Sequence, residues 1–170
     1  MDKKLDKNTL VELINYFGVP DAEYWADQDL NDDIWAHFAA FRFLRPLQNH
    51  LDGYLESPKE WVNGVLNRRD SGEIGRIMKS MVEAGIPPKD IGIFAYWIAR
   101  EAYNFVLYRL SDPGGDDYDL ENEEELPSWS LVEINLRKVG NTVDHIFTGR
   151  YIPDLHTIFP YRNPEGKPRT

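Results

Sequence analysis

Glu101 is the residue whose place in the sequence best suits general acid or base chemistry. It lies at the edge of the apolar arc of a predicted helix over residues 88 to 110, with an aromatic residue one turn away on either side. A carboxyl group partly buried among such rings has a raised pKa, which is how a general acid or base is often built. Arg100 and Tyr108 complete this candidate buried polar site. The same placement suits a structural ion pair, and we favour it because no nucleophile motif accompanies Glu101. The candidate ion-pair partners are Arg68, Arg69 and Arg76.

Residues 112 to 128 form a second candidate site, because they carry eight acidic side chains and no basic one. The net charge of the whole chain is -10, so this segment holds most of its acidity. Like charges gathered in one segment steer and speed association with a basic protein partner. We therefore predict a partner-binding loop, although such a run also occurs where it only keeps a protein in solution. The predicted binding residues are Asp116, Asp117, Tyr118, Asp119, Glu121, Glu123, Glu124 and Glu125.

Metal binding is the third chemistry that the sequence raises. Alternate acidic residues from Asp117 to Glu121 are spaced like calcium ligands, but the EF-hand template fails at Asn122, where it needs glycine. Asp33 and His37 share one face of a predicted helix, yet two ligands are too few for a site. The sequence also lacks the glycine-rich phosphate loops and the serine-hydrolase motif. We therefore expect no metal and no other cofactor.

The predicted helix over residues 88 to 110 is the element around which the chain is organised. Its apolar residues follow helical spacing and cover most of the circumference, which indicates a helix with neighbours on most sides. We expect the helix at 73 to 84 and the strand at 129 to 136 to pack against it. The predicted core face consists of Ile91, Phe94, Ala95, Ile98, Ala102, Phe105 and Val106.

Several shorter helices precede this central one. Capping residues and apolar spacing predict a helix over about 9 to 17, and at most a short helical turn before Asn31. Asn31 is the predicted cap of the next helix, which Pro46 ends or kinks. Ser57, followed by a proline, starts another.

A β-hairpin is predicted after the acidic segment, because the apolar period changes to two and Gly140-Asn141 separates two such runs. A short helix over DLHTIF follows it. We therefore predict a mainly helical single-domain bundle of five or six helices around the central helix, about 88 to 110, with a small C-terminal β-hairpin. The domain spans residues 1 to 159 with an acidic loop at 111 to 128 inserted, and residues 160 to 170 form a flexible tail.

Composition limits the class of protein. A chain of 170 residues with 42% hydrophobic residues can bury the core of one domain. It has no cysteine, no secretory signal and no apolar run that would span a bilayer, so we expect a cytoplasmic protein with no membrane partner. A net charge of -10 is unsuited to phosphate contacts, so we expect no nucleic acid partner.

The segment WIAREAYNFVLYRLSDP, followed by LPSWSLVEIN and later by DLH, resembles small bacterial cytoplasmic proteins of the polymorphic-toxin immunity type. The likeness covers about residues 73 to 156, supplies no catalytic residue, and implies a helical domain with a small strand element and an inhibitor role. We therefore predict a cytoplasmic protein-binding inhibitor that neutralises a cognate toxin by occluding it. Two alternatives stay open. One is a small enzyme that uses Glu101 in a pocket beside the central helix, and the other is a phage or mobile-element protein that blocks a host defence complex.

Overall fold

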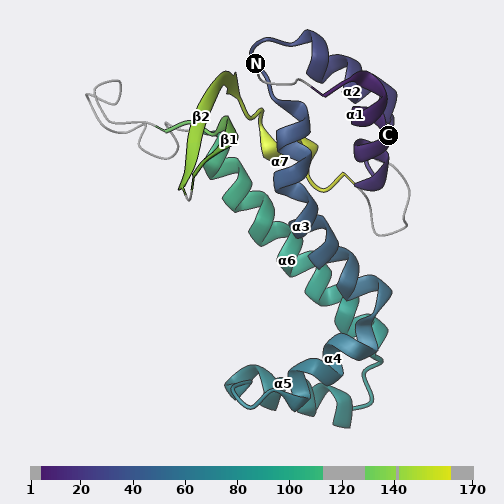
Figure 1. Ribbon diagram of the computed structural model, residues 1–170. Coiled ribbons are helices and arrows are strands. Elements are labelled where there is room, and N and C mark those ends of the chain that lie inside the picture. The colour runs from purple at the N-terminus through teal and green to yellow at the C-terminus, as the bar shows by residue number, and fades with distance from the viewer. Residues whose placement is uncertain (1–4, 113–128, 141, 162–170) are drawn as a thin grey trace, which may run out of the picture. The chain divides into compact units, whose positions relative to one another are not determined.

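The computed structural model describes residues 5–112, 129–140 and 142–161 (Figure 1). Within these residues the chain forms seven helices and one two-stranded antiparallel sheet. The predicted mainly helical fold with a small C-terminal hairpin is therefore confirmed. Residue contacts gather into two compact units, unit 1 with Met1–Arg45 and Asn104–Thr170, and unit 2 with Pro46–Tyr103. The single-domain organisation stays a prediction.

Unit 1 begins with two helices that pack against each other, α1 (Lys7–Tyr16) and α2 (Ala22–Asn31). Asp6 caps α1, because its carboxylate accepts a hydrogen bond of 3.1 Å from the backbone N–H of Thr9. The second helix is ten residues long, where the sequence predicted only a short turn. It forms because small side chains such as Ala26 are fully buried along its inner face.

The helix α3 (His37–Glu56) begins later than the sequence predicts, because Asp32 forms a turn after α2. The Oδ1 atom of Asp32 accepts hydrogen bonds from the backbone N–H groups of Ile34 and Trp35, both at 2.8 Å. These two hydrogen bonds are the main reason that the pKa of Asp32 is lowered. The prediction that Asn31 caps this helix was therefore wrong.

We expect Asp32 to stabilise the fold only while its carboxyl group is ionised. Because folding lowers its pKa from the usual 3.8, this stabilisation is complete above pH 3.8 and disappears as the pH falls through the folded pKa. Asp32→Asn keeps a side-chain acceptor but removes the charge. Urea unfolding at several values between about pH 6 and pH 2 should show that the stability advantage of the native chain shrinks toward zero in acid. An advantage that stays constant with pH would contradict this role.

The predicted hairpin is formed by β1 (Val132–Val139) and β2 (Thr142–Tyr151), which pair antiparallel. Val139 pairs with Thr142, so the connection is a two-residue turn, as the sequence predicts. Gly140 in this turn has a φ of 60°, a left-handed conformation that glycine adopts without strain.

The hairpin is joined to the segment before α3 by a short parallel bridge between Trp35 and Tyr151. The backbone N–H of Ala36 donates to the carbonyl oxygen of Tyr151, and the N–H of Tyr151 donates to that of Ile34, both at 2.8 Å. The short helix α7 (Leu155–Ile158) then follows, where the sequence predicted one.

The core of unit 1 includes side chains from both ends of the chain. Tyr161 is 3% exposed and its hydroxyl donates to the carbonyl oxygen of Phe17 at 3.4 Å. The predicted tail therefore begins at least two residues too early, since Pro160 is buried as well. Other fully buried members of this core are Leu10, Ile14, Phe41, Leu44, Leu107, Leu155 and Phe159.

Unit 2 contains the second part of α3, then α4 (Pro58–Asn67), α5 (Gly72–Glu83) and the first part of α6 (Pro88–Ser111). Its α3 segment continues past Pro46, so this proline does not end the helix. Its core cluster consists of Val62, Val65, Met78 and Ile91, with Trp61, Leu66 and Met81 packed against it.

Gly92 of α6 lies close to the backbone of α3 in unit 2. A Cβ atom on Gly92 would lie 2.3 Å from the backbone oxygen of Tyr54 and 2.8 Å from the Cβ of Pro58. Gly64 of α4 differs, because no atom lies within 4 Å of a Cβ added there.

We expect Gly92→Ala to lower the free energy of unfolding by about 1 to 3 kcal/mol, because α3 and α6 must move apart to admit the methyl group. Gly64→Ala is the matched control and should raise it by up to about 1 kcal/mol, since alanine favours the helix. Urea unfolding of both variants measures the two effects. If both variants change the free energy of unfolding by the same amount in the same direction, the close approach of α3 and α6 does not exclude a side chain at Gly92.

Candidate functional site

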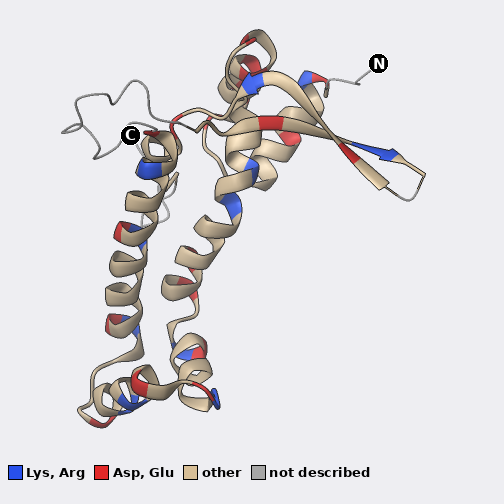
Figure 2. Ribbon diagram, turned by 90° about the vertical axis from the view of Figure 1, so that its left-hand side faces the viewer, with Lys and Arg blue, Asp and Glu red and all other residues tan. Residues whose placement is uncertain are grey.

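The helix α6 exposes the face that the sequence assigns to the core. Tyr96 and Leu107 are buried but lie on a different arc from the predicted core face, of which Ile91 is buried. The ribbon of α6 is tan for most of its length in Figure 2, with charged residues at few places. The predicted core face was therefore wrong, because a helix that is apolar nearly all round does not reveal which arc its neighbours cover. The exposed fractions are 61% for Phe94, 59% for Ile98, 64% for Phe105 and 53% for Val106.

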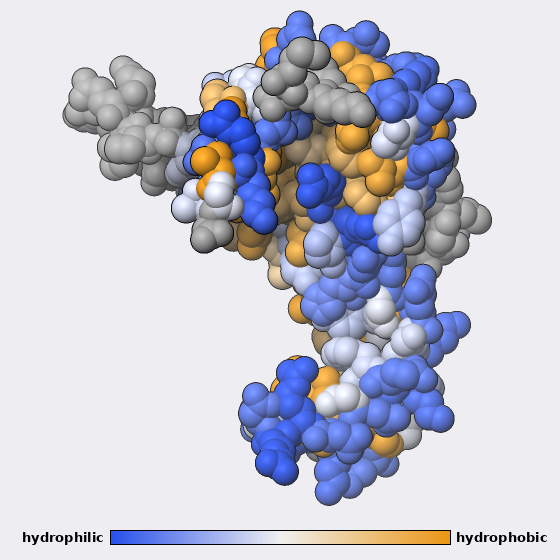
Figure 3. Space-filling model, viewed as in Figure 1, coloured by the Kyte–Doolittle hydropathy of each residue, from blue (hydrophilic) through white to orange (hydrophobic). Residues whose placement is uncertain are grey.

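The hairpin also has an exposed apolar face. Val132, Ile134 and Leu136 alternate along β1 and therefore share one face of it. Phe147 pairs with Ile134 across the hairpin. All four are exposed, up to 66% for Leu136. Apolar side chains lie among hydrophilic ones on the hairpin in Figure 3. We call these four residues the hairpin face, and their exposure contradicts the expectation that this side of the strand packs against the central helix.

Arg150 of β2 attaches the hairpin to the helices of unit 1. Its Nε and Nη2 atoms donate to the two carboxylate oxygens of Glu133 at 3.0 and 2.9 Å, and its Nη1 donates to the backbone oxygen of Asp29 at 2.8 Å. Asp29 in turn accepts a hydrogen bond from the N–H of Phe38 at 2.8 Å. Burial acts to lower the pKa of Arg150, but the hydrogen bonds to Glu133 and the charge of Asp29 outweigh it and raise that pKa. The guanidinium is therefore charged and fully engaged in a structural role.

A cavity of about 550 Å³ lies beside this ion cluster. Asp29, Glu133 and Arg150 line it but are already bonded to one another. Asp33 and Arg42 also line it, and among the described residues neither makes an ion pair. These two groups carry opposite charges. The wall also includes Thr148, whose hydroxyl donates to the backbone oxygen of Glu133 at 3.3 Å. The cavity therefore offers no clear arrangement for catalysis.

A second cavity, of about 150 Å³, lies where the hairpin, the end of α6 and the segment before α3 come together in unit 1. Trp35, Trp129 and Tyr151 line it, and their exposed fractions are 42%, 40% and 40%. Asp154 and Ser111 are polar members of its wall. Asp154 precedes α7, but its side chain makes no capping hydrogen bond. We call this the aromatic cavity, because three aromatic rings and one carboxylate lie in its wall.

The candidate buried polar site of α6 does not form. Glu101 is exposed, and within the described part of the chain it makes no ion pair, so its expected burial was wrong. Arg100 is half-buried, and its guanidinium carbon lies 4.7 Å from the centroid of the Trp97 ring. Tyr108 is 44% exposed. Glu101 lines neither of the two cavities described above.

The predicted binding residues of the acidic segment, Asp116 to Glu125, lie outside the described residues. Their role stays a prediction. The described residues Ser111 and Trp129, which stand on either side of the segment, both line the aromatic cavity. The structure therefore brings these two flanking residues to one place in unit 1.

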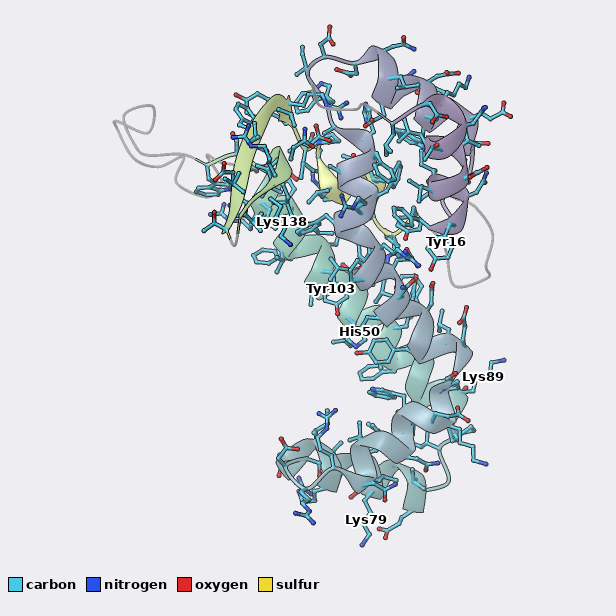
Figure 4. The ribbon with its side chains drawn as sticks, viewed as in Figure 1. Tyr16, His50, Lys79, Lys89, Tyr103 and Lys138 are labelled. Carbon is cyan, nitrogen blue, oxygen red and sulfur yellow. The ribbon has the colours of Figure 1, made fainter. Side chains whose placement is uncertain are left out.

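A polar cluster that the sequence did not reveal joins α3 and α6 in unit 2. The Nδ1 atom of His50 is hydrogen-bonded to the hydroxyl of Tyr103, and its Nε2 to the hydroxyl of Tyr54 at 3.1 Å (Figure 4). Burial raises the pKa of both tyrosines, so their hydroxyls stay protonated. The helical spacing of His50 and Tyr54 is visible in the sequence. The partner Tyr103 comes from a distant helix, and no local pattern could have indicated it.

Metal-ligating side chains are not gathered in the described residues, where no group of three or more could hold an ion. Asp33 and His37, which the sequence places on one helix face, make different contacts. Asp33 lines the larger of the two cavities described above, whereas Nε2 of His37 lies 3.6 Å from Oδ2 of Asp32. Of the helices that the structure describes, none has the length and apolar character needed to cross a bilayer.

Comparisons of the chain with models of protein families, with curated proteins and with solved structures find no match. The resemblance to immunity-type proteins stays a prediction. The arguments for function therefore come from three surface features of the chain itself, namely the exposed arc of α6, the hairpin face and the aromatic cavity.

Proposed function

We propose that this chain is a cytoplasmic protein-binding inhibitor of the immunity type, which neutralises a cognate toxin by occluding it. The observation that carries the proposal is the exposed hairpin face. Apolar side chains that group at the surface and are rimmed by polar ones are typical of protein contact sites. Tryptophan and tyrosine, which line the nearby aromatic cavity, are the side chains that most often dominate binding energy.

Charge supports a basic partner. The eight acidic side chains of residues 112 to 128 raise the rate at which a basic surface meets this one, while apolar contacts of the hairpin face slow its release. Both effects act together only if the partner carries a basic rim around an apolar centre. A toxin domain that binds a polyanionic substrate carries a basic surface of this kind.

The two alternatives have less support. An enzyme built on Glu101 requires a concave site at that residue, whereas Glu101 is exposed and lines neither described cavity. A protein that blocks a host defence complex would use the same binding surface as a toxin inhibitor. The identity of the bound partner separates these two functions.

Affinity capture from the native cytoplasm tests the proposal. The immobilised chain should retain a basic protein at low salt and release it at high salt, because exposed charges are screened. The double variant Ile134→Ser and Phe147→Ser should retain much less of it. Ile74→Ser is the matched control, since Ile74 is an apolar residue of α5 that is 53% exposed in unit 2. Equal retention by the hairpin variant and the control would remove the hairpin face from the binding surface.

A further inference from the structure

We propose that the aromatic cavity is the anchor site for one arginine side chain of the partner protein. This inference rests on the proposed function and names the group of the partner that the chain holds. The argument comes from the rings of the cavity, its charge, its rigidity and its size.

The three rings suit a planar cation. A guanidinium group is attracted to the electron-rich faces of tryptophan and tyrosine, and it stacks on them more readily than an ammonium group. Trp129 already accepts such a group within the chain, since the guanidinium carbon of Arg109 lies 5.9 Å from its ring centroid. Arg109 does not line the cavity, whereas Trp35 and Tyr151 do.

One carboxylate in the wall of the cavity also favours a cation. The exposed carboxylate of Asp154 lines the wall, and among the described residues it makes no ion pair. An arginine in the cavity would meet short-range attraction from Asp154.

The wall is held in place before any partner binds. Trp35 and Tyr151 belong to backbone segments that are hydrogen-bonded to each other, and the N–H of Ile152 donates to the oxygen of Leu131 at 2.9 Å. A preformed wall lowers the ordering cost of binding. The volume of about 150 Å³ is below the roughly 300 to 1,000 Å³ of small-molecule sites, so it suits one side chain.

Binding of a blocked pentapeptide, Gly-Gly-Arg-Gly-Gly, to the full chain tests the inference. The peptide should shift the indole N–H signals of Trp35 and Trp129 in NMR spectra, and the same peptide with neutral citrulline should not. Trp129→Ala should weaken binding about tenfold, the loss expected for a cation–π contact and its pocket wall. Asp154→Asn, a nearly isosteric exposed change, should weaken it about threefold, the loss expected for an exposed charge pair.

Trp97→Ala is the matched control. Trp97 is 44% exposed and carries the guanidinium of Arg100 on its ring, but it belongs to unit 2. Its removal should leave peptide affinity unchanged. Equal binding of the citrulline peptide, or an equal loss with Trp97→Ala, would overturn the inference.

The isolated partner separates this inference from the proposed function. If Trp129→Ala and the native chain bind and inhibit the partner equally, the arginine anchor is wrong and the inhibitor proposal stands. If the arginine peptide binds the cavity but the native chain does not inhibit the protein that it captures, the inhibitor proposal is wrong. The claim that the cavity holds an arginine of a toxin is then wrong as well.

Discussion

Association with the partner should slow at least tenfold at low salt when seven acidic side chains of the segment are replaced by their amides. Clustered charges steer a basic protein into contact, so their loss lowers the association rate more than it raises the dissociation rate. The rate of the variant should also depend only weakly on salt, because little charge remains to be screened. Stopped-flow binding at several salt concentrations measures both effects. The replaced residues are Asp116, Asp117, Asp119, Glu121, Glu123, Glu124 and Glu125.

A dispersed variant with the same change in net charge is the control for this experiment. It replaces seven exposed acidic residues outside the segment, and its association rate should stay within a few-fold of that of the native chain. Unchanged kinetics in the segment variant would rule out the acidic segment as the docking element. Equal slowing in both variants would assign the effect to net charge alone. The control residues are Glu12, Glu23, Glu56, Glu60, Asp70, Asp90 and Glu101.

Arg150→Ala should lower the free energy of unfolding by about 3 kcal/mol, because it leaves two carboxylates without their cation. The Arg150 side chain is 14% exposed, and those of Asp29 and Glu133 are 7% and 18% exposed. Water can therefore compensate for little of the loss. Urea unfolding measures the change, and we also expect weaker partner binding because the hairpin loses its attachment to Asp29.

Arg137→Ala provides the matched comparison on the same hairpin. Arg137 pairs with Asp144 at 3.1 Å, but the two side chains are 65% and 48% exposed. An ion pair in water contributes little, so this variant should lose less than about 1 kcal/mol. If both variants lose the same amount, burial does not distinguish the two ion pairs and the structural role of Arg150 is wrong.

The sequence predicts where helices and strands form better than it predicts which of their faces are buried. Pro88 at the start of α6 and the two-residue turn after Val139 are local signals, and the structure confirms the helix and the hairpin that they predict. Which arc of α6 is buried depends on distant neighbours. Phe94 and Ile98 follow the same spacing as buried Ile91, and only the tertiary structure shows that the first two are exposed.

The candidate site likewise combines residues that the sequence reveals with contacts that it does not reveal. The charge of residues 112 to 128 is plain in the sequence, and so is the presence of Trp35 and Trp129. Their meeting in one cavity with Tyr151 depends on the bridge between the hairpin and the segment before α3, which no local pattern indicates. The contact of Arg150 with Asp29 is equally non-local.

The most direct test of the central claim is a titration of the isolated partner's toxic activity with the native chain. An inhibitor that occludes its target should abolish that activity in a linear fall that ends at one chain per partner molecule. The hairpin variant Ile134→Ser with Phe147→Ser should require a large excess to reach the same inhibition. A partner that is saturated with the native chain and keeps its full activity would contradict the account.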